Sequence, residues 1–78
     1  MPRYFFNTNG LGSFSDQDGS ELADLQAACS EASRLAGEIL KYEGEAFWQI
    51  REWHLDVSDE SGSVLFSLDI SASGAKTD

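Results

Sequence analysis

The longest regular pattern of hydrophobic positions in the chain runs from Asp24 to Tyr42. Apolar side chains recur there every three or four residues, which places them on one face of an α-helix: Leu25, Ala28, Cys29, Ala32, Leu35, Ala36, Ile39 and Leu40. Asp24 is a suitable N-cap, because its carboxylate can accept hydrogen bonds from the free amides of the first turn. Gly44 is a natural C-terminal stop. The pattern predicts one amphipathic helix whose apolar face, Cys29 included, is buried.

The segment before this helix predicts a β-hairpin. Tyr4, Phe5 and Phe6 form a short run of high β propensity, and the dipeptide at positions 9–10, Asn-Gly, supplies the positive φ angles of a tight turn. A second, weaker strand is expected over residues 11–15, with Phe14 as its one large apolar side chain. The acidic, glycine-containing stretch 16–21 is predicted to be a polar link to the helix.

The period changes to two after the helix, which indicates two further strands. Trp53, Leu55 and Val57 alternate with polar residues, and a turn at residues 59–62 separates them from a second alternating run that ends at Ile70. The stretch 45–50 fits either a short helical turn or a lead into the strand. The order predicts an α+β fold: a two-layer ββαββ arrangement of an antiparallel sheet with one amphipathic helix packed on one face. Residues 1–71 form the single domain, and residues 72–78 are predicted to be a disordered tail.

Composition narrows the partners and the location. The 78-residue chain has a formal net charge of -9, and a negative field of this kind repels phosphate backbones and anionic lipids. Neither nucleic acid nor a membrane is therefore an expected partner. The one cysteine cannot form an internal disulfide, and we find no signal peptide and no apolar run long enough to cross a membrane. These features predict a cytoplasmic protein.

Two groups of polar residues are candidate sites of chemistry. Asp16 and Asp18 lie in a loop with Gly19, but the glycine is fourth rather than sixth, so the spacing of an EF-hand calcium loop is not met. Glu52, His54 and Asp56 share the polar side of one predicted strand and could bind a metal or act in acid-base catalysis. The favoured interpretation has no catalytic residue, no metal and no cofactor. A metal-dependent or acid-base enzyme using Glu52, His54 and Asp56 is the alternative.

The aromatic residues of the first strand suggest a binding surface. Phe5 points to one side of the strand while Tyr4 and Phe6 point to the other, and a single helix covers only one side. Either the Phe47-Trp48 segment closes a second small core, or these aromatics bind another protein. Aromatic side chains are enriched at interfaces, so the predicted interaction residues are Tyr4, Phe6, Phe47, Trp48 and Leu65.

These features favour a small non-catalytic protein-interaction module over an enzyme. Its partner is another protein or a second copy, giving a homodimer, held by the aromatic face of the first strand or by an open sheet edge. A third possibility is a mimic of nucleic acid charge, which rests on the net charge of -9 alone.

Several short motifs resemble a family of small bacterial proteins that is classed as a domain of unknown function. They are the opening hexapeptide Met-Pro-Arg-Tyr-Phe-Phe at residues 1–6, then Asp18-Gly19, Glu21-Leu22, Asp24, Ala27-Ala28 and Glu31-Ala32, and later Val57, Asp59 and Gly62. The resemblance covers residues 1–70. It differs at Asn7, where an acidic residue or histidine is expected, and the Phe47-Trp48 segment is particular to this chain. The family has no established activity, so the resemblance implies a free-standing soluble domain and transfers no site residue.

Overall fold

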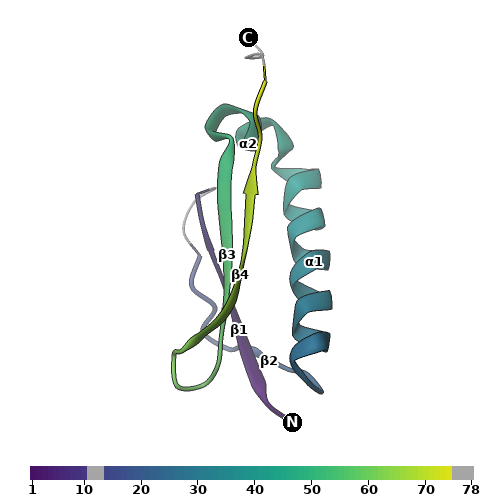
Figure 1. The fold of residues 1–78 in the computed structure, drawn as a ribbon, viewed down its shortest axis with the longest axis vertical. Helices are drawn as coiled ribbons and strands as arrows, with labels where there is room; N and C mark the ends of the chain where they lie inside the picture. The colour runs from purple at the N-terminus through teal and green to yellow at the C-terminus, as the bar shows by residue number, and fades with distance from the viewer. Residues whose placement is uncertain (11–13, 75–78) are drawn as a thin grey trace.

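The computed structural model describes residues 1–10 and 14–74. In this part of the chain two helices, α1 (Leu25–Tyr42) and α2 (Gly44–Ile50), accompany one antiparallel sheet. The sheet is formed by β1 (Arg3–Asn9), β2 (Ser20–Glu21), β3 (Glu52–Ser58) and β4 (Val64–Ser71), in the order β2-β1-β3-β4. Figure 1 shows α1 alongside the length of the sheet and α2 at one end of it. The fold is therefore α+β, as predicted.

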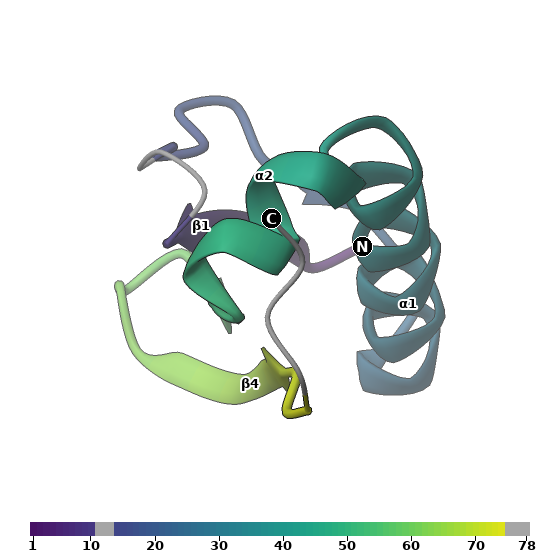
Figure 2. The same ribbon diagram turned by 90° about the horizontal axis from the view of Figure 1, so that it is seen from above.

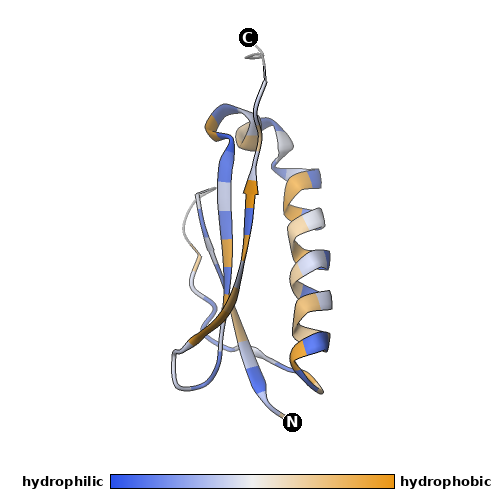
Figure 3. Cartoon of the chain, viewed as in Figure 1, coloured by the Kyte–Doolittle hydropathy of each residue, from blue (hydrophilic) through white to orange (hydrophobic). Residues whose placement is uncertain are grey.

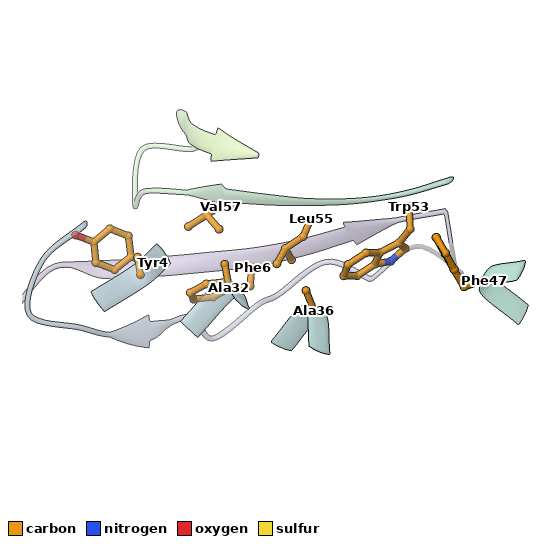
Figure 4. Close-up of a cluster of buried hydrophobic side chains, with 9 residues drawn as sticks. Tyr4, Phe6, Ala32, Ala36, Phe47, Trp53, Leu55 and Val57 are labelled. Atoms are coloured by element: carbon orange, nitrogen blue, oxygen red, sulfur yellow. The ribbon is translucent and has the colours of Figure 1, made fainter. Parts of the chain in front are cut away.

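The core lies between α1 and one face of the sheet. Trp53, Leu55 and Val57 alternate along β3 and are all 0% exposed, and burying side chains of this size contributes roughly 1.5–3 kcal/mol each. Tyr4 and Phe6 of β1 extend this layer (Figure 4). The helix contributes three alanines, Ala28, Ala32 and Ala36. Because alanine is short, these side chains allow the helix backbone to lie close to the aromatic layer.

Phe47 closes the end of this core. It lies on α2 and is 5% exposed, and Figure 2 shows α2 crossing the end of the sheet. The αL conformation of Arg51, with φ 64°, ends α2 and turns the chain directly into β3. The stretch 45–50, for which the sequence allowed either a helical turn or a lead into the strand, is therefore part of a second helix. Phe47 of this helix is in the core, and its neighbour Trp48 is exposed.

The N-terminal hairpin differs from the prediction. Asn9 still belongs to β1, where it pairs with His54 of β3, so Asn9 is not in a two-residue turn. The chain returns at Phe14, which forms an isolated bridge with Thr8. Of the predicted second strand over residues 11–15, residues 11–13 lie outside the described residues. The strand that pairs with the start of β1 is instead β2, within the stretch predicted to be a polar link.

Two other details concern Cys29 and the C-terminal end. Cys29 is exposed, contrary to the prediction that it is buried. The core-facing stripe of α1 is centred on its alanines, so Cys29 lies on the flank of the helix. Of the predicted disordered tail over residues 72–78, residues 75–78 lie outside the described residues. Within the described part, the Ala72 N–H donates to the Arg51 carbonyl, and Arg51 Nη1 donates to the Gly74 carbonyl at 2.8 Å.

Candidate functional site

The outer edge of β1 is covered by the segment that follows it. Asp16 is the centre of this cover, because its carboxylate accepts hydrogen bonds from the Phe6 N–H at 3.2 Å and from the Gly19 N–H at 3.0 Å. Further along, Thr8 and Phe14 exchange both backbone hydrogen bonds, at 2.9 and 3.1 Å. Together with β2, which pairs with Arg3 and Tyr4, these contacts occupy the Phe6 N–H and both backbone groups of Thr8, which β1 turns away from β3. This cover blocks the pairing of another strand along β1.

Gly19 allows the cover to lie this close to β1. Its φ is +72°, and a Cβ placed there would lie 2.8 Å from Arg3 Cγ, 2.9 Å from the Phe5 ring and 3.0 Å from the Tyr4 carbonyl oxygen. Only glycine fits both the backbone angle and the space. The loop therefore covers Phe5, the aromatic side chain on the face opposite Tyr4 and Phe6, so neither side of β1 is left as an open aromatic surface.

The outer edge of β4 has no such cover in the part of the chain that the structure describes. This strand is last in the sheet, and β3 is its only paired neighbour there. The Ala72 N–H donates to Arg51 of the β3 side, and in an antiparallel ladder inward-facing and outward-facing residues alternate. Ser67, Asp69 and Ser71 therefore turn their N–H and C=O groups outward, away from β3.

The side chains of β4 are mostly apolar and partly exposed. Phe66, Leu68 and Ile70 pair with the buried residues of β3 and are half-buried. At the start of the strand Val64 is 60% exposed and Leu65 is 42% exposed. Figure 3 shows orange, hydrophobic segments along β4 and on the side of α1 that faces the sheet. The strand carries one charged residue, Asp69, and neither proline nor lysine, the residues that commonly prevent an edge from pairing.

The structure separates the five residues predicted to form an interaction surface. Tyr4, Phe6 and Phe47 are 6%, 5% and 5% exposed and belong to the core, so in the single chain they form no open surface. The physical reason is that Tyr4 and Phe6 are on the face that α1 covers. Trp48 and Leu65 are exposed, at 44% and 42%, but they lie near opposite ends of the sheet, on α2 and at the start of β4.

Trp48 has neighbours within its own chain. The Arg51 guanidinium lies over its ring, 5.7 Å from the centroid, and the Phe47 ring meets it edge-on at a centroid distance of 6.0 Å. Tyr42 and Ile50, 73% and 44% exposed, are nearby in sequence on the helices at this end of the molecule. The Arg51 guanidinium makes a cation–π contact with one face of the indole ring. Trp48 therefore packs against its own chain as well as facing solvent.

His54 lies on the face of the sheet away from α1, among carboxylates from two strands. Its Nδ1 is 2.8 Å from Asp69 Oδ1, and its Nε2 is 3.6 Å from Glu52 Oε1. The hydrogen bond with Asp69 raises the pKa of His54 above its ordinary value, with smaller contributions from the charges of Glu52 and Asp56. Asp56 itself accepts a hydrogen bond from Ser67 Oγ at 2.6 Å.

This arrangement is a set of ion pairs on an exposed surface. Over the described residues, no group of three or more histidine, cysteine, aspartate or glutamate side chains is arranged to hold a metal ion. Asp16 and Asp18, the other acids considered for a metal, are in the loop covering β1, where the Asp16 carboxylate also accepts the Asp18 N–H at 3.2 Å. The structure does not bring them together with Glu52, His54 and Asp56.

A cavity of about 370 Å³ lies between α1 and the cover of β1. Its walls are mainly apolar, and its two acidic side chains already have partners: Asp16 holds backbone amides, and Glu31 is paired with Arg34 at 2.7 Å. The Arg34 hydrogen bond lowers the pKa of Glu31. The other lining residues are Phe6, Thr8, Phe14, Ser20, Leu35, Ile39 and Leu55. The cavity thus presents an apolar surface without a convergent set of free polar groups.

The open edge of β4 is the feature that sequence analysis missed. The sequence predicts an open sheet edge as a binding surface but does not identify the strand that forms it. The signal for β4 was present in the sequence, since residues 64–71 form a long apolar strand with one charge. What sequence could not supply was the strand order, which places β4 rather than β3 at the edge.

Comparisons with known proteins give a family and no activity. Neither curated proteins nor solved structures yield a match. Within residues 1–10 and 14–74, no helix is both long and apolar enough to span a membrane. The profile of one protein family matches residues 3–71, nearly the whole chain. The chain belongs to this family, a domain of unknown function (DUF6894).

Proposed function

We propose that this chain is a non-catalytic protein-interaction module that binds an extended segment of a polypeptide along the open edge of β4. The observation that carries the proposal is the difference in backbone pairing between the two edges: Ser67, Asp69 and Ser71 turn their backbone groups outward and, within residues 1–10 and 14–74, meet no partner strand there. An added strand satisfies these groups by main-chain hydrogen bonds, which is the mode of recognition called β-augmentation.

The side chains of β4 support the same proposal. Phe66, Leu68 and Ile70 are half-buried on the helix-facing side, and a neighbouring strand would lie about 4.8 Å away with its own side chains beside them. An incoming segment with apolar residues at every second position thus removes further apolar surface from water. Specificity then comes from this alternation, since main-chain hydrogen bonds do not distinguish sequences.

The proposal includes a cytoplasmic location. Cys29 is an exposed free thiol, and exposed thiols stay reduced in the cytoplasm, whereas in oxidising compartments they tend to form disulfides. A fusion to a fluorescent protein, followed by cell fractionation, tests this part. Recovery in a secreted or periplasmic fraction would contradict it.

The test of binding compares two substitutions at one residue. Ser67→Pro removes an outward N–H and places a ring against any incoming strand, while leaving the bonds to β3 in place. Ser67→Ala is the matched control, because it also loses the hydrogen bond to Asp56 but keeps the N–H. Wild type and both variants are immobilised and exposed to lysate of the organism that carries the gene, and each retained protein is purified and its binding measured directly.

We expect partners to bind wild type and Ser67→Ala with similar affinity and to lose at least about tenfold in affinity for Ser67→Pro. Circular dichroism and thermal unfolding establish that Ser67→Pro is folded. Equal binding of a purified partner by all three proteins would exclude the β4 edge as the binding site.

A further inference from the structure

We infer that the occupant of the β4 edge is a second copy of this chain, paired antiparallel to the first about a twofold axis at Leu68. This inference rests on the proposed function, because it names the partner for the same edge. The result would be one continuous sheet in which the two β4 strands are neighbours and a helix α1 from each copy lies on the same face.

The outward backbone groups limit how two β4 strands can pair. A residue that turns its groups outward must face another such residue, so the twofold axis can lie at Ser67, Leu68 or Asp69 near the middle of the strand. An axis at Asp69 places the two Asp69 carboxylates directly opposite each other, which is unfavourable. An axis at Ser67 places each Asp69 opposite the apolar Leu65 of the second copy.

An axis at Leu68 gives the chemically matched pairing. Ser67 then faces Asp69 of the second copy, and the reverse pair occurs on the other side of the axis. Ser67 Oγ donates to Asp56 Oδ1 in the single chain, and its one hydrogen would turn to the facing carboxylate in the dimer; one oxygen of that carboxylate is already 2.8 Å from His54 Nδ1. The two residues also exchange both backbone hydrogen bonds, so the two symmetric pairs supply four main-chain bonds.

The same register matches the apolar side of the strand. Leu68 faces Leu68 of the second copy across the axis, and Phe66 faces Ile70 of the second copy. All three side chains are half-buried in the single chain, and each gains an apolar cross-strand neighbour. Between residues 66 and 70 a single register therefore pairs apolar with apolar residues on one face and serine with aspartate on the other. Self-complementarity of this kind is what a twofold interface requires.

The salt dependence of binding distinguishes a second copy of this chain from a basic peptide as the partner. Each copy has a formal net charge of -9, so two copies repel each other through solvent and salt reduces this repulsion. Within β4 itself Asp69 is the one charged residue, so the contact does not bury a pair of like charges. A dimer of this chain becomes tighter as salt rises. A complex with a basic segment becomes weaker.

The test measures the dimer dissociation constant by sedimentation equilibrium for wild type and for charge variants at Ser67. Ser67→Lys places a lysine opposite Asp69 of the other copy at both symmetric pairs of the dimer, and Ser67→Asp places an aspartate at the same positions. The matched controls are Ser71→Lys and Ser71→Asp. Ser71 is also exposed, and its partner on β3 is acidic too, Glu52 in place of Asp56, but in the proposed register it faces Leu65 of the second copy.

We expect wild type to dimerise, with a dissociation constant that falls as salt rises. Ser67→Lys should lower the constant about three- to tenfold, and Ser67→Asp should raise it at least about tenfold, because each change acts at two symmetric pairs. The Ser71 variants report the effect of net charge alone and should shift it much less. Urea unfolding of each variant shows that the single chain remains folded.

Three results would overturn the inference. The first is a monomer at all concentrations; if Ser67→Pro still abolishes binding of another protein, the proposed function stands and only its partner is wrong. The second is a dimer that responds equally to charge at Ser67 and Ser71, which places the axis elsewhere on β4. The third is a dimer that Ser67→Pro leaves intact. In that case a different surface pairs the copies, and binding by the β4 edge must then be judged on the capture experiment alone.

Discussion

The two edges of this sheet are treated in opposite ways. At the edge of β1, a loop centred on Asp16, a bridge at Phe14 and the short strand β2 occupy the outward backbone groups. At the edge of β4, a mostly apolar strand of eight residues has no partner strand on its outer side in the described part of the chain. Exposed strand edges promote association, and proteins usually guard them. The guard on one side shows that this chain can protect an edge, so the open side is the one to examine for function.

The largest effect is expected at Gly19, where the cover of β1 is most tightly packed. Gly19→Ala forces a left-handed residue and a contact of 2.8 to 3.0 Å with three groups of β1, and we expect it to cost about 3 to 4 kcal/mol of unfolding free energy. Gly62→Ala is the control, since Gly62 has φ +90° but no neighbour within 4 Å of its added Cβ. It should cost about 1 kcal/mol in urea unfolding. Equal costs would mean that the loop is not packed on β1.

Proline placed at each edge compares the two directly. Thr8→Pro removes an N–H that donates to the Phe14 carbonyl at 2.9 Å, so we expect a loss of about 3 kcal/mol. Ser67→Pro removes an N–H that has no role in the ladder with β3, and should cost less than about 1 kcal/mol in the monomer. The two values are measured by urea unfolding at a concentration below that of dimer formation. A cost at Ser67 as large as that at Thr8 would show that the β4 edge is already occupied.

Removing the Asp16 carboxylate uncovers β1 without a steric clash. Asp16→Ala leaves the N–H groups of Phe6, Asp18 and Gly19 without their acceptor, and we expect a loss of about 2 kcal/mol. Asp18→Ala changes the net charge equally and serves as the control, with an expected change within about 0.5 kcal/mol. Chemical denaturation of both variants gives the difference. If the control is as unstable as Asp16→Ala, the effect comes from charge and not from the lost acceptor.

The smallest effect concerns the His54 and Asp69 pair beside the β4 edge. The folded-state pKa of His54 is raised by Asp69, so the protonated histidine is bound more tightly in the folded state than in the unfolded chain. Its contribution to stability is complete below the unfolded value near 6.5 and is lost as pH rises through the higher folded value. We expect thermal stability to fall slightly over this range in wild type and not in His54→Gln. A rise with pH in wild type alone would reverse the assigned sign.

Sequence patterns predicted those elements whose hydrophobic period is long. The helix expected from Asp24 to Tyr42 is α1. Asp24 is its N-cap, and its carboxylate accepts a hydrogen bond from the Ala27 N–H at 2.9 Å. The alternating run with Trp53, Leu55 and Val57 forms β3, and the second alternating run, which ends at Ile70, forms β4. These segments repeat their pattern over several turns or pleats, so local sequence alone identifies them.

The parts that were not predicted depend on contacts between distant residues. β2 has only two residues, too few to show a hydrophobic period. The cover of β1 depends on the Asp16 carboxylate, which accepts a hydrogen bond from the Phe6 N–H ten residues earlier in the chain. Cys29 differs from Ala28 in burial because of how the helix is rotated over the sheet. Likewise, Tyr4 and Phe6 have the composition of an interface, but the position of α1 makes them core. The site at β4 required the strand order, which local sequence does not encode.

Amide hydrogen exchange followed residue by residue is the most direct measurement of the difference between the two edges. The amides of Phe6 and Thr8 should be protected at every protein concentration, because they donate within the chain. The amides of Ser67 and Asp69 should exchange rapidly in dilute protein and become protected as concentration rises and β4 strands pair. Rapid exchange at all concentrations would contradict self-association at this edge, and protection in dilute monomer would show that the edge is not open.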